Sequence, residues 1–156
     1  MVEALPGLTE FSFVTSHPKD TTEDLFKAMR DCQKLKKYLH LPAQSGSDRI
    51  LALMNRMYTR AQYGALVDAY RKIVPGAALS TDIIIGFPTE SDADFEATHS
   101  LIKDVLFDSA YIFKYSPRPH ASASALPDDV AKEEKERRHA IILSLQKEIS
   151  KKKKGV

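Results

Sequence analysis

The chain has 156 residues, of which 43% are hydrophobic, so it can bury a core of its own but leaves little room for two domains. Its 23 Lys and Arg residues barely exceed its 21 Asp and Glu residues, so net charge alone does not indicate a polyanionic partner. A single cysteine, Cys32, excludes a disulfide framework and any all-cysteine zinc or iron-sulfur site built from this chain alone. With no export signal and no long apolar run, the sequence predicts a cytoplasmic protein with no membrane partner.

The N-terminal part predicts a strand, a helix and a second strand. Residues 10–16 (EFSFVTS) alternate apolar and small polar side chains, which is typical of a strand. A helix should follow, with Thr21 or Thr22 as its cap and apolar side chains at helical spacing. Residues 37–42 (KYLHLP) form a short apolar run closed by proline, which fits a second strand.

The middle of the chain predicts two helices and its clearest strand. The polar loop 44–48 (QSGSD) can cap a helix that carries the apolar residues of 50–54, and another helix runs from about 59 to 75. Residues 78–86 (ALSTDIIIG) then form a strand that is apolar on both faces. Such a strand is expected under helices on one side and packed side chains on the other, so the sheet should be parallel.

The last third repeats the pattern. Ser91 and Asp94 resemble a capping box ahead of a third helix, residues 109–115 predict a fourth strand, and a final helix should run from about 131 to 150. Four β-α units in series predict an α/β fold, either a partial parallel (β/α) barrel or an open parallel sheet.

The predicted domain organisation is simple. Residues 1–150 should form one partial-barrel domain, and residues 151–156 a basic, disordered tail. The run Lys151–Lys154 fits a solvated end, with contact to phosphates as the alternative reading.

In such folds ligands bind at the carboxyl ends of the strands. There, Gln44, Ser45 and Ser47 offer an amide and hydroxyls before a helix N-terminus, which suits an anionic or hydroxyl-rich ligand or merely a capped turn. Arg56 could grip a carboxylate, or it could complement the end of its helix. His17, a lone histidine before proline, fits a turn residue better than a catalytic one.

A second candidate group surrounds the clearest strand. Gly86 and Phe87 close it with a backbone that lets a flat ring approach, although a structural kink would look similar. Asp82 interrupts its apolar run, and an ionised carboxylate there must be paired or must face a wet cavity. We expect the cavity.

Two long segments carry a family resemblance. Residues 39–59 (LHLPAQSGSDRILALMNRMYT) and 80–95 (STDIIIGFPTESDADF) resemble the later half of the radical-SAM domain of the methylthiotransferases. The segments 15–20 (TSHPKD), 107–111 and 115–119 favour the tRNA branch of that family. The resemblance covers nearly the whole chain, and it implies half of a radical-SAM barrel.

The resemblance also implies an activity. The complete family enzyme adds a methylthio group to an N6-modified adenosine beside the anticodon of tRNA. Its [4Fe-4S] cluster reductively cleaves S-adenosylmethionine, and the resulting radical abstracts hydrogen from the adenine ring. By resemblance, Gln44, Ser45 and Ser47 would line the methionine and ribose side of S-adenosylmethionine, and Arg56 would hold its carboxylate.

On the strand side, the resemblance places Gly86 and Phe87 against the adenine and Asp82 in the barrel cavity. Two departures lie in cofactor-side loops: Thr89 replaces a usual glycine, and residues 120–121 (His-Ala) replace a usual Gly-Thr. Both put the shape of these loops in doubt.

Larger departures concern the metal. The family holds its radical cluster by three cysteines at CxxxCxxC spacing and a second cluster by three more, and this sequence has neither set, so it offers no metal ligands. It also stops before the family's C-terminal β-domain. We therefore expect a chain that is inert alone, as a truncation, a fragment, or one part of a split protein whose N-terminal half acts in trans. The alternatives are a non-catalytic tRNA- or cofactor-binding module and a methylthiotransferase for threonylcarbamoyl-adenosine.

Overall fold

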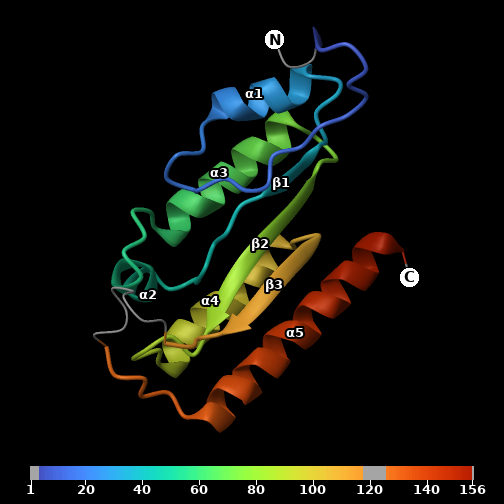
Figure 1. The fold of residues 1–156 in the computed structure, drawn as a ribbon. Helices are drawn as coiled ribbons and strands as arrows, with labels where there is room; N and C mark the ends of the chain where they lie inside the picture. Colours follow the sequence, from blue (N-terminus) through green and yellow to red (C-terminus); the bar gives the residue numbers. More distant parts are fainter. Residues whose placement is uncertain (1–3, 118–125, 156) are drawn as a thin grey trace.

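The structure, a computed structural model, describes residues 4–117 and 126–155 (Figure 1). Helices and strands alternate along most of the chain. In order they are α1 (Glu23–Asp31), β1 (Tyr38–His40), α2 (Asp48–Leu53), α3 (Arg60–Ile73), β2 (Ala78–Ile85), α4 (Asp92–Val105), β3 (Ser109–Lys114) and α5 (Lys132–Lys154).

The three strands form one parallel sheet in the order β1-β2-β3, which confirms the predicted parallel arrangement. One face of the sheet carries the helices and the core. Leu39, Leu79, Ile83 and Ile85 are fully buried there, in one cluster with apolar side chains of α1, α3, α4 and α5. Burial of these side chains is the main source of stability, because each contributes roughly 1.5–3 kcal/mol.

Side-chain caps explain why three helices begin where they do. Ser47 accepts a hydrogen bond from the Ile50 amide at the start of α2. Thr59 begins α3 and Ser91 begins α4, and both form complete capping boxes with the third helical residue. Such a cap satisfies amides that have no partner within the helix, and each is worth about 1 kcal/mol. The predicted cap at Ser91 is confirmed.

The first predicted strand differs most from the structure. Phe11 makes an isolated parallel bridge to Leu35, and the Ser16 amide donates to the His40 carbonyl at 3.0 Å. The segment thus follows the free edge of β1 and is bonded to it only near its two ends. Because β1 is just three residues long, it offers few partners for a continuous ladder, and three regular strands form where four were predicted.

The predicted disordered tail is also incorrect. Helix α5 continues through Lys154 and ends at Gly155, which has the left-handed conformation common at helix ends. Four consecutive lysines complement the negative end of the helix dipole, and Lys153 pairs with Asp108 at 2.9 Å.

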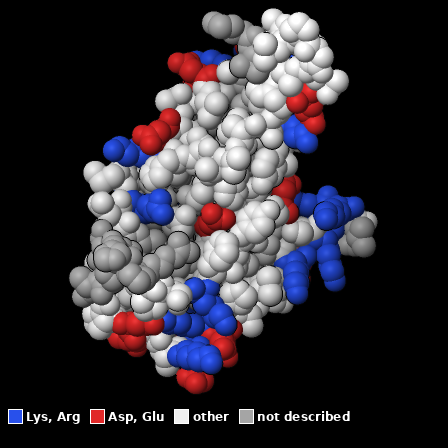
Figure 2. All heavy atoms as spheres, viewed as in Figure 1, with Lys and Arg blue, Asp and Glu red and all other residues white. Residues whose placement is uncertain are grey.

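The other face of the sheet, the inner face, is open. Tyr111 and Phe113 of β3 are 54% and 53% exposed there, and Ile84 is half-buried. Figure 2 looks onto this side and shows a mainly uncharged surface with acidic atoms near its middle. Within the described residues, nothing covers the inner face as helices cover the outer one, so the side chains expected to pack against the inner face of β2 are not supplied by this part of the chain.

No helix in the described part of the chain is both long and apolar enough to cross a membrane. The altered pair at residues 120–121 lies outside the described residues.

Candidate functional site

The candidate site lies where the strands end, and it begins with a bulge after β1. His40 pairs with Ser80, and Gln44 bridges Ile83. The chain therefore advances four residues after β1 for every three residues of β2, which is the pattern of a bulge. Gln44 takes a φ of 65°, and its backbone bonds Asp82 and Ile84 at 2.8 and 2.9 Å. Within the described residues, no hydrogen bond reaches its side-chain amide. The bulge therefore presents a free amide at the end of the strand.

The two predicted serines face α4 instead. Ser45 Oγ lies 3.2 Å from Thr98 Oγ1, the Gly46 amide donates to the same hydroxyl at 2.9 Å, and Ser47 Oγ donates to Asp94 at 2.6 Å. Gly46 is required for this approach, because a Cβ atom there would come within 2.6 Å of the Thr98 Cα. The side chains of Ser45 and Ser47 thus hold the loop against α4.

The turn after β2 depends on a buried carboxylate. Gly86 has a φ of 69°, and its amide donates to Glu90 Oε2 at 2.9 Å. The side chain of Glu90 is fully buried and pairs with Arg138 Nη1 of α5 at 2.8 Å. Burial raises the pKa of the Glu90 carboxyl, although the hydrogen bond from Arg138 opposes the shift. Phe87, also buried, meets Tyr115 edge to face at 5.2 Å.

Helix α5 fastens this turn. The side chain of Arg138 is 5% exposed and also pairs with Asp92 at 2.8 Å and with Glu134 at 2.6 Å. Hydrogen bonds from Arg137 and then Arg138 lower the pKa of Glu134 to about 2. The side chain of Lys135 covers Gly86 so closely that a Cβ atom on that glycine would meet it.

Sequence reasoning missed Glu90, Lys135 and Arg138. For Glu90, an acidic residue just after a glycine turn was a usable signal. The charged residues of α5 gave no such signal, because a run of charged residues on a helix is typical of a solvated face.

Thr89 stands where the sequence resemblance led us to expect glycine. It takes a φ of 67°, in the left-handed region that β-branched residues rarely adopt. Its amide donates to Asp129 at 2.7 Å, and its carbonyl accepts from Arg49 Nη2 at 2.6 Å. The substitution therefore retains a glycine-like backbone, held by contacts on both sides.

Arg56 lies in the segment that follows α2, where it contacts His17. Its Nη1 is 3.1 Å from His17 Nε2, and its Nε is buried with no hydrogen-bond partner among the described residues. The His17 ring meets Tyr58 at 5.7 Å, and the Tyr58 hydroxyl donates to the Pro42 carbonyl. The buried, unpartnered Nε means that the guanidinium has unused capacity toward an anion.

Asp82 projects onto the inner face. Its side chain is 27% exposed, and its Oδ2 lies 3.4 Å from His40 Nε2. The carboxylate is thus both paired and open to the inner face.

These residues share one end of the sheet. Gln44 hydrogen-bonds the strand that carries Asp82 and leads into Gly86, and Arg49 of α2 contacts Thr89 in the next loop. The two turns expected to meet one ligand are therefore neighbours, as the carboxyl ends of parallel strands must be.

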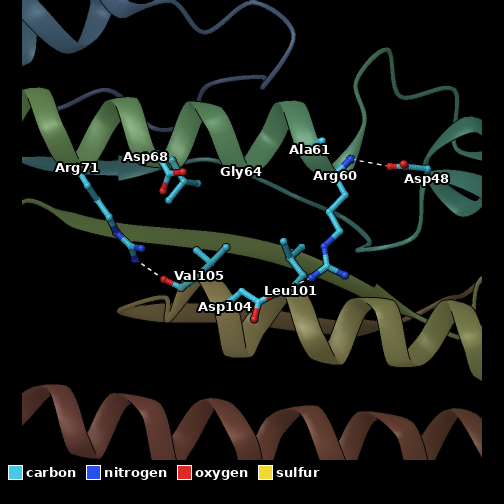
Figure 3. Close-up of a pocket in the computed structure, with 10 residues that line it drawn as sticks. Asp48, Arg60, Ala61, Gly64, Asp68, Arg71, Leu101, Asp104 and Val105 are labelled. Atoms are coloured by element: carbon cyan, nitrogen blue, oxygen red, sulfur yellow. Dashed lines mark hydrogen bonds and ion pairs between the residues drawn. The ribbon is translucent and has the colours of Figure 1, made fainter.

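A separate pocket of about 440 Å³ lies on the helical side of the sheet, between α3 and α4 (Figure 3). Arg60 and Arg71 cross it from α3, and both contact α4 or the residues that end it: Arg60 bonds Asp104 at 2.6 Å, and Arg71 bonds the Val105 carbonyl. The pocket contains none of the strand-end residues, so we do not assign the ligand to it.

The described residues do not fit an iron-sulfur cluster. Among them, no group of three or more His, Cys, Asp or Glu side chains could hold a metal ion. Cys32, the one cysteine of the sequence, caps the end of α1 and packs against the core. A cluster needs several thiolates, so its ligands would have to come from outside this chain.

A parallel sheet with helices on one face and a polar strand end defines part of a β/α barrel. A family model described as the Radical SAM superfamily matches residues 2–102. The chain therefore belongs to the radical SAM superfamily, as the sequence resemblance predicted.

Three relatives share the name tRNA-2-methylthio-N(6)-dimethylallyladenosine synthase. The protein from Acetivibrio thermocellus is 47% identical over 96% of this chain and 31% of its own length. Those from Yersinia enterocolitica and Neisseria gonorrhoeae are 47% and 46% identical, over 91% and 88% of this chain and 30% and 31% of their own lengths. The chain thus spans about a third of the length of these relatives. They give no support to the prediction that a separate chain supplies the missing half.

The fold also occurs in a solved structure. It is described as coproporphyrinogen III oxidase (HemN) from Escherichia coli, a radical SAM enzyme, and matches with a TM-score of 0.74 at 19% identity. The match covers 90% of this chain and 32% of that one, which confirms a partial barrel.

Proposed function

We propose that this chain is a part of the catalytic barrel of a tRNA methylthiotransferase that modifies N6-dimethylallyladenosine in cytoplasmic tRNA. The observation that carries the proposal is the identity of 46–47% with synthases of that name, extending over the strand-end residues described above. S-adenosylmethionine, when bound, would supply the radical chemistry of the superfamily.

Groups with unused bonding capacity support a cofactor site at the strand ends. Gln44 offers its free amide, and Arg56 offers a guanidinium whose Nε is buried and unpartnered. A carboxylate and an ammonium group, as in the methionine part of S-adenosylmethionine, suit such donors and acceptors. Ser45 and Ser47 would act by holding the loop against α4.

The turn at Gly86 and Phe87 would receive the adenine of the cofactor. Gly86 gives the turn its left-handed backbone at the end of β2, and the turn is fixed by Glu90 and Arg138. Preorganisation of this kind lowers the cost of ordering a loop around a ligand. The chain would bind and orient the cofactor, and residues outside it would supply the cluster.

A chimera tests the proposal. This chain would replace the matching segment of the Acetivibrio thermocellus relative, in cells that lack a methylthiotransferase of their own. We expect 2-methylthio-N6-dimethylallyladenosine in their tRNA, measured by mass spectrometry of nucleosides. A folded, iron-loaded chimera that produces none, or that modifies threonylcarbamoyl-adenosine instead, would contradict the proposal.

The same chimera tests Arg56. Replacing it by methionine should raise the KM for S-adenosylmethionine about tenfold or more, because a charged hydrogen bond contributes about 1.5–3 kcal/mol. Lys103→Met is the matched control, since Lys103 is an exposed cation on α4, away from the strand ends. Its KM should stay unchanged.

A further inference from the structure

The inner face carries a hydrogen-bonded group that the proposed function does not use. His40 Nδ1 lies 2.8 Å from Ser80 Oγ, and the Tyr38 hydroxyl lies 2.5 Å from the same oxygen. His40 Nε2 lies 3.4 Å from Asp82 Oδ2, and the ring edge meets Tyr111 at 5.9 Å. All five residues lie on β1, β2 or β3 and belong to the side of the sheet away from the helices.

This arrangement leaves one acceptor unused. Both ring nitrogens of His40 have partners, and its side chain is only 12% exposed, so it serves to fix Asp82 and Tyr111. In the part of the chain that the structure describes, no hydrogen bond reaches Asp82 Oδ1. A carboxylate oxygen without a donor attracts an N–H group from a ligand, because charged acceptors form the stronger hydrogen bonds.

An aromatic ring lies beside that acceptor. Asp82 and Tyr111 are direct partners in the β2–β3 register, so their side chains emerge side by side on adjacent strands, roughly 5 Å apart. The Tyr111 ring is 54% exposed, and its edge is fixed by His40. An exposed ring of this kind is a platform on which a nucleobase can stack, worth about 1–3 kcal/mol per base.

We propose that Asp82 and Tyr111 form a subsite for an adenine ring, with the base stacked on Tyr111 and its exocyclic N6–H donated to Asp82 Oδ1. His40 is a positioning residue that holds both side chains. The proposal rests on the proposed function for its choice of base, since adenine occurs both in the substrate nucleoside and in S-adenosylmethionine. One N6–H suffices, so an adenosine with a single N6 substituent also fits.

A pair of ligands tests the contact on the 156-residue chain itself. Adenosine keeps the N6–H, whereas N6,N6-dimethyladenosine keeps the stacking surface and lacks the donor. In titrations followed by nuclear magnetic resonance, we expect adenosine to bind about tenfold more tightly. Equal affinities for the two would overturn the proposal.

Variants locate the effect. Asp82→Ala should abolish the preference for adenosine, Tyr111→Ala should weaken both ligands at least fivefold, and Tyr111→Phe should retain both affinities. Phe113→Ala is the matched control, because Phe113 is equally exposed on the same strand but pairs with Ile84. Its ratio of affinities should be unchanged, and loss of the preference in this control would also overturn the proposal. The amide spectrum shows that each variant is folded.

Competition identifies the source of the base. If the subsite takes the adenine of S-adenosylmethionine, that cofactor will displace adenosine and shift the Tyr111 signals. If it takes the substrate base, the two ligands will bind together. Displacement of adenosine by S-adenosylmethionine with no change in the signals of Tyr111 or Asp82 would overturn the proposal. The chimera separates this inference from the proposed function, because an active chimera whose KM values are insensitive to Asp82→Ala refutes the subsite alone.

Discussion

At the scale of single residues, Arg138 has the largest expected effect on stability. It neutralises Glu90, whose carboxylate is fully buried, and bonds two further carboxylates, on Asp92 and Glu134. Replacing Arg138 by methionine leaves the buried charge of Glu90 unpaired, which should cost about 3–5 kcal/mol in the free energy of unfolding measured with urea.

A second substitution provides the control. In the double variant Glu90→Gln with Arg138→Met, no unpaired charge remains, so a large part of the loss should be recovered. Burial already raises the pKa of Glu90, so in the single variant the loss should shrink as the pH falls and the carboxyl is protonated. A loss that is the same at all pH values, or no recovery in the double variant, would refute this explanation.

The contribution of Asp94 to the stability of the fold should depend on pH in the opposite direction. Burial acts to raise the pKa of its carboxyl, but hydrogen bonds from Arg49, Ser47 and Ser91 outweigh burial and hold the pKa well below its usual range. A lowered pKa stabilises the fold above the unfolded value of about 3.9, and that stability is lost as the pH falls through the folded pKa.

Asp94→Asn should therefore cost about 2 kcal/mol at neutral pH and change little further in acid. Unfolding profiles between about pH 6 and pH 2 check this, because the wild-type curve should fall more steeply than that of the variant. Parallel curves would show that Asp94 is not the group responsible.

Thr89 tests the cost of its backbone conformation. Thr89→Gly removes the strain of a positive φ, worth roughly 1–2 kcal/mol, but loses chain entropy and the hydroxyl contact with Arg49. Thr89→Ala keeps the positive φ and loses the hydroxyl contact as well. We expect the glycine variant to be at least as stable as the wild type and the alanine variant to be less stable, as measured by thermal unfolding.

At the scale of elements, the chain offers a matched pair of glycines. Gly46 packs so closely on α4 that a methyl group would meet the backbone of Ala97 and Thr98, whereas Gly64 in the middle of α3 has open space around its Cβ position. Gly46→Ala should destabilise the chain by several kcal/mol, since backbone cannot yield as a flexible side chain can. Gly64→Ala should stabilise it by about 0.5–1 kcal/mol, because alanine favours the helix. Urea unfolding of both variants provides the measurement.

The elements also show what the sequence can predict. Local signals were sufficient for β2 and for the start of α4, since the apolar run of the strand and the capping pair Ser91 and Asp94 act over a few residues. The segment 10–16 was misread because its alternation cannot show whether its neighbour is long enough to pair with it. The strand-end residues could be proposed from the sequence for the same reason, because a polar loop that follows a strand is recognised from a few neighbouring residues.

Long-range contacts could not be found in this way. Glu90 and Arg138 are 48 residues apart, and neither neighbourhood indicates the other. Likewise, nothing near Ser45 and Ser47 in the sequence shows that α4 takes up their hydroxyl groups. These contacts arise only when helices pack on the sheet, and they decide which polar side chains remain free for a ligand.

At the scale of the whole molecule, the open inner face predicts self-association. Within the described residues β3 pairs with no strand other than β2, although His139 of α5 contacts the Ile112 carbonyl at 3.0 Å, and two aromatic side chains of β3 are exposed on the inner face. Light scattering after size-exclusion chromatography should show a mass that rises with concentration. Phe113→Glu should reduce this rise, and Lys103→Glu on α4 should not. A monomer at all concentrations would contradict the prediction.

The fastening of the Gly86 turn by α5 has a consequence for synthesis on the ribosome. The turn needs Arg138, which is made some fifty residues after it, so the end of β2 cannot take its final form while the intervening helix and strand emerge. During that interval the carboxylate of Glu90 has to remain solvated or protonated. Arrival of α5 then supplies Arg138 to the turn and the last apolar side chains to the core.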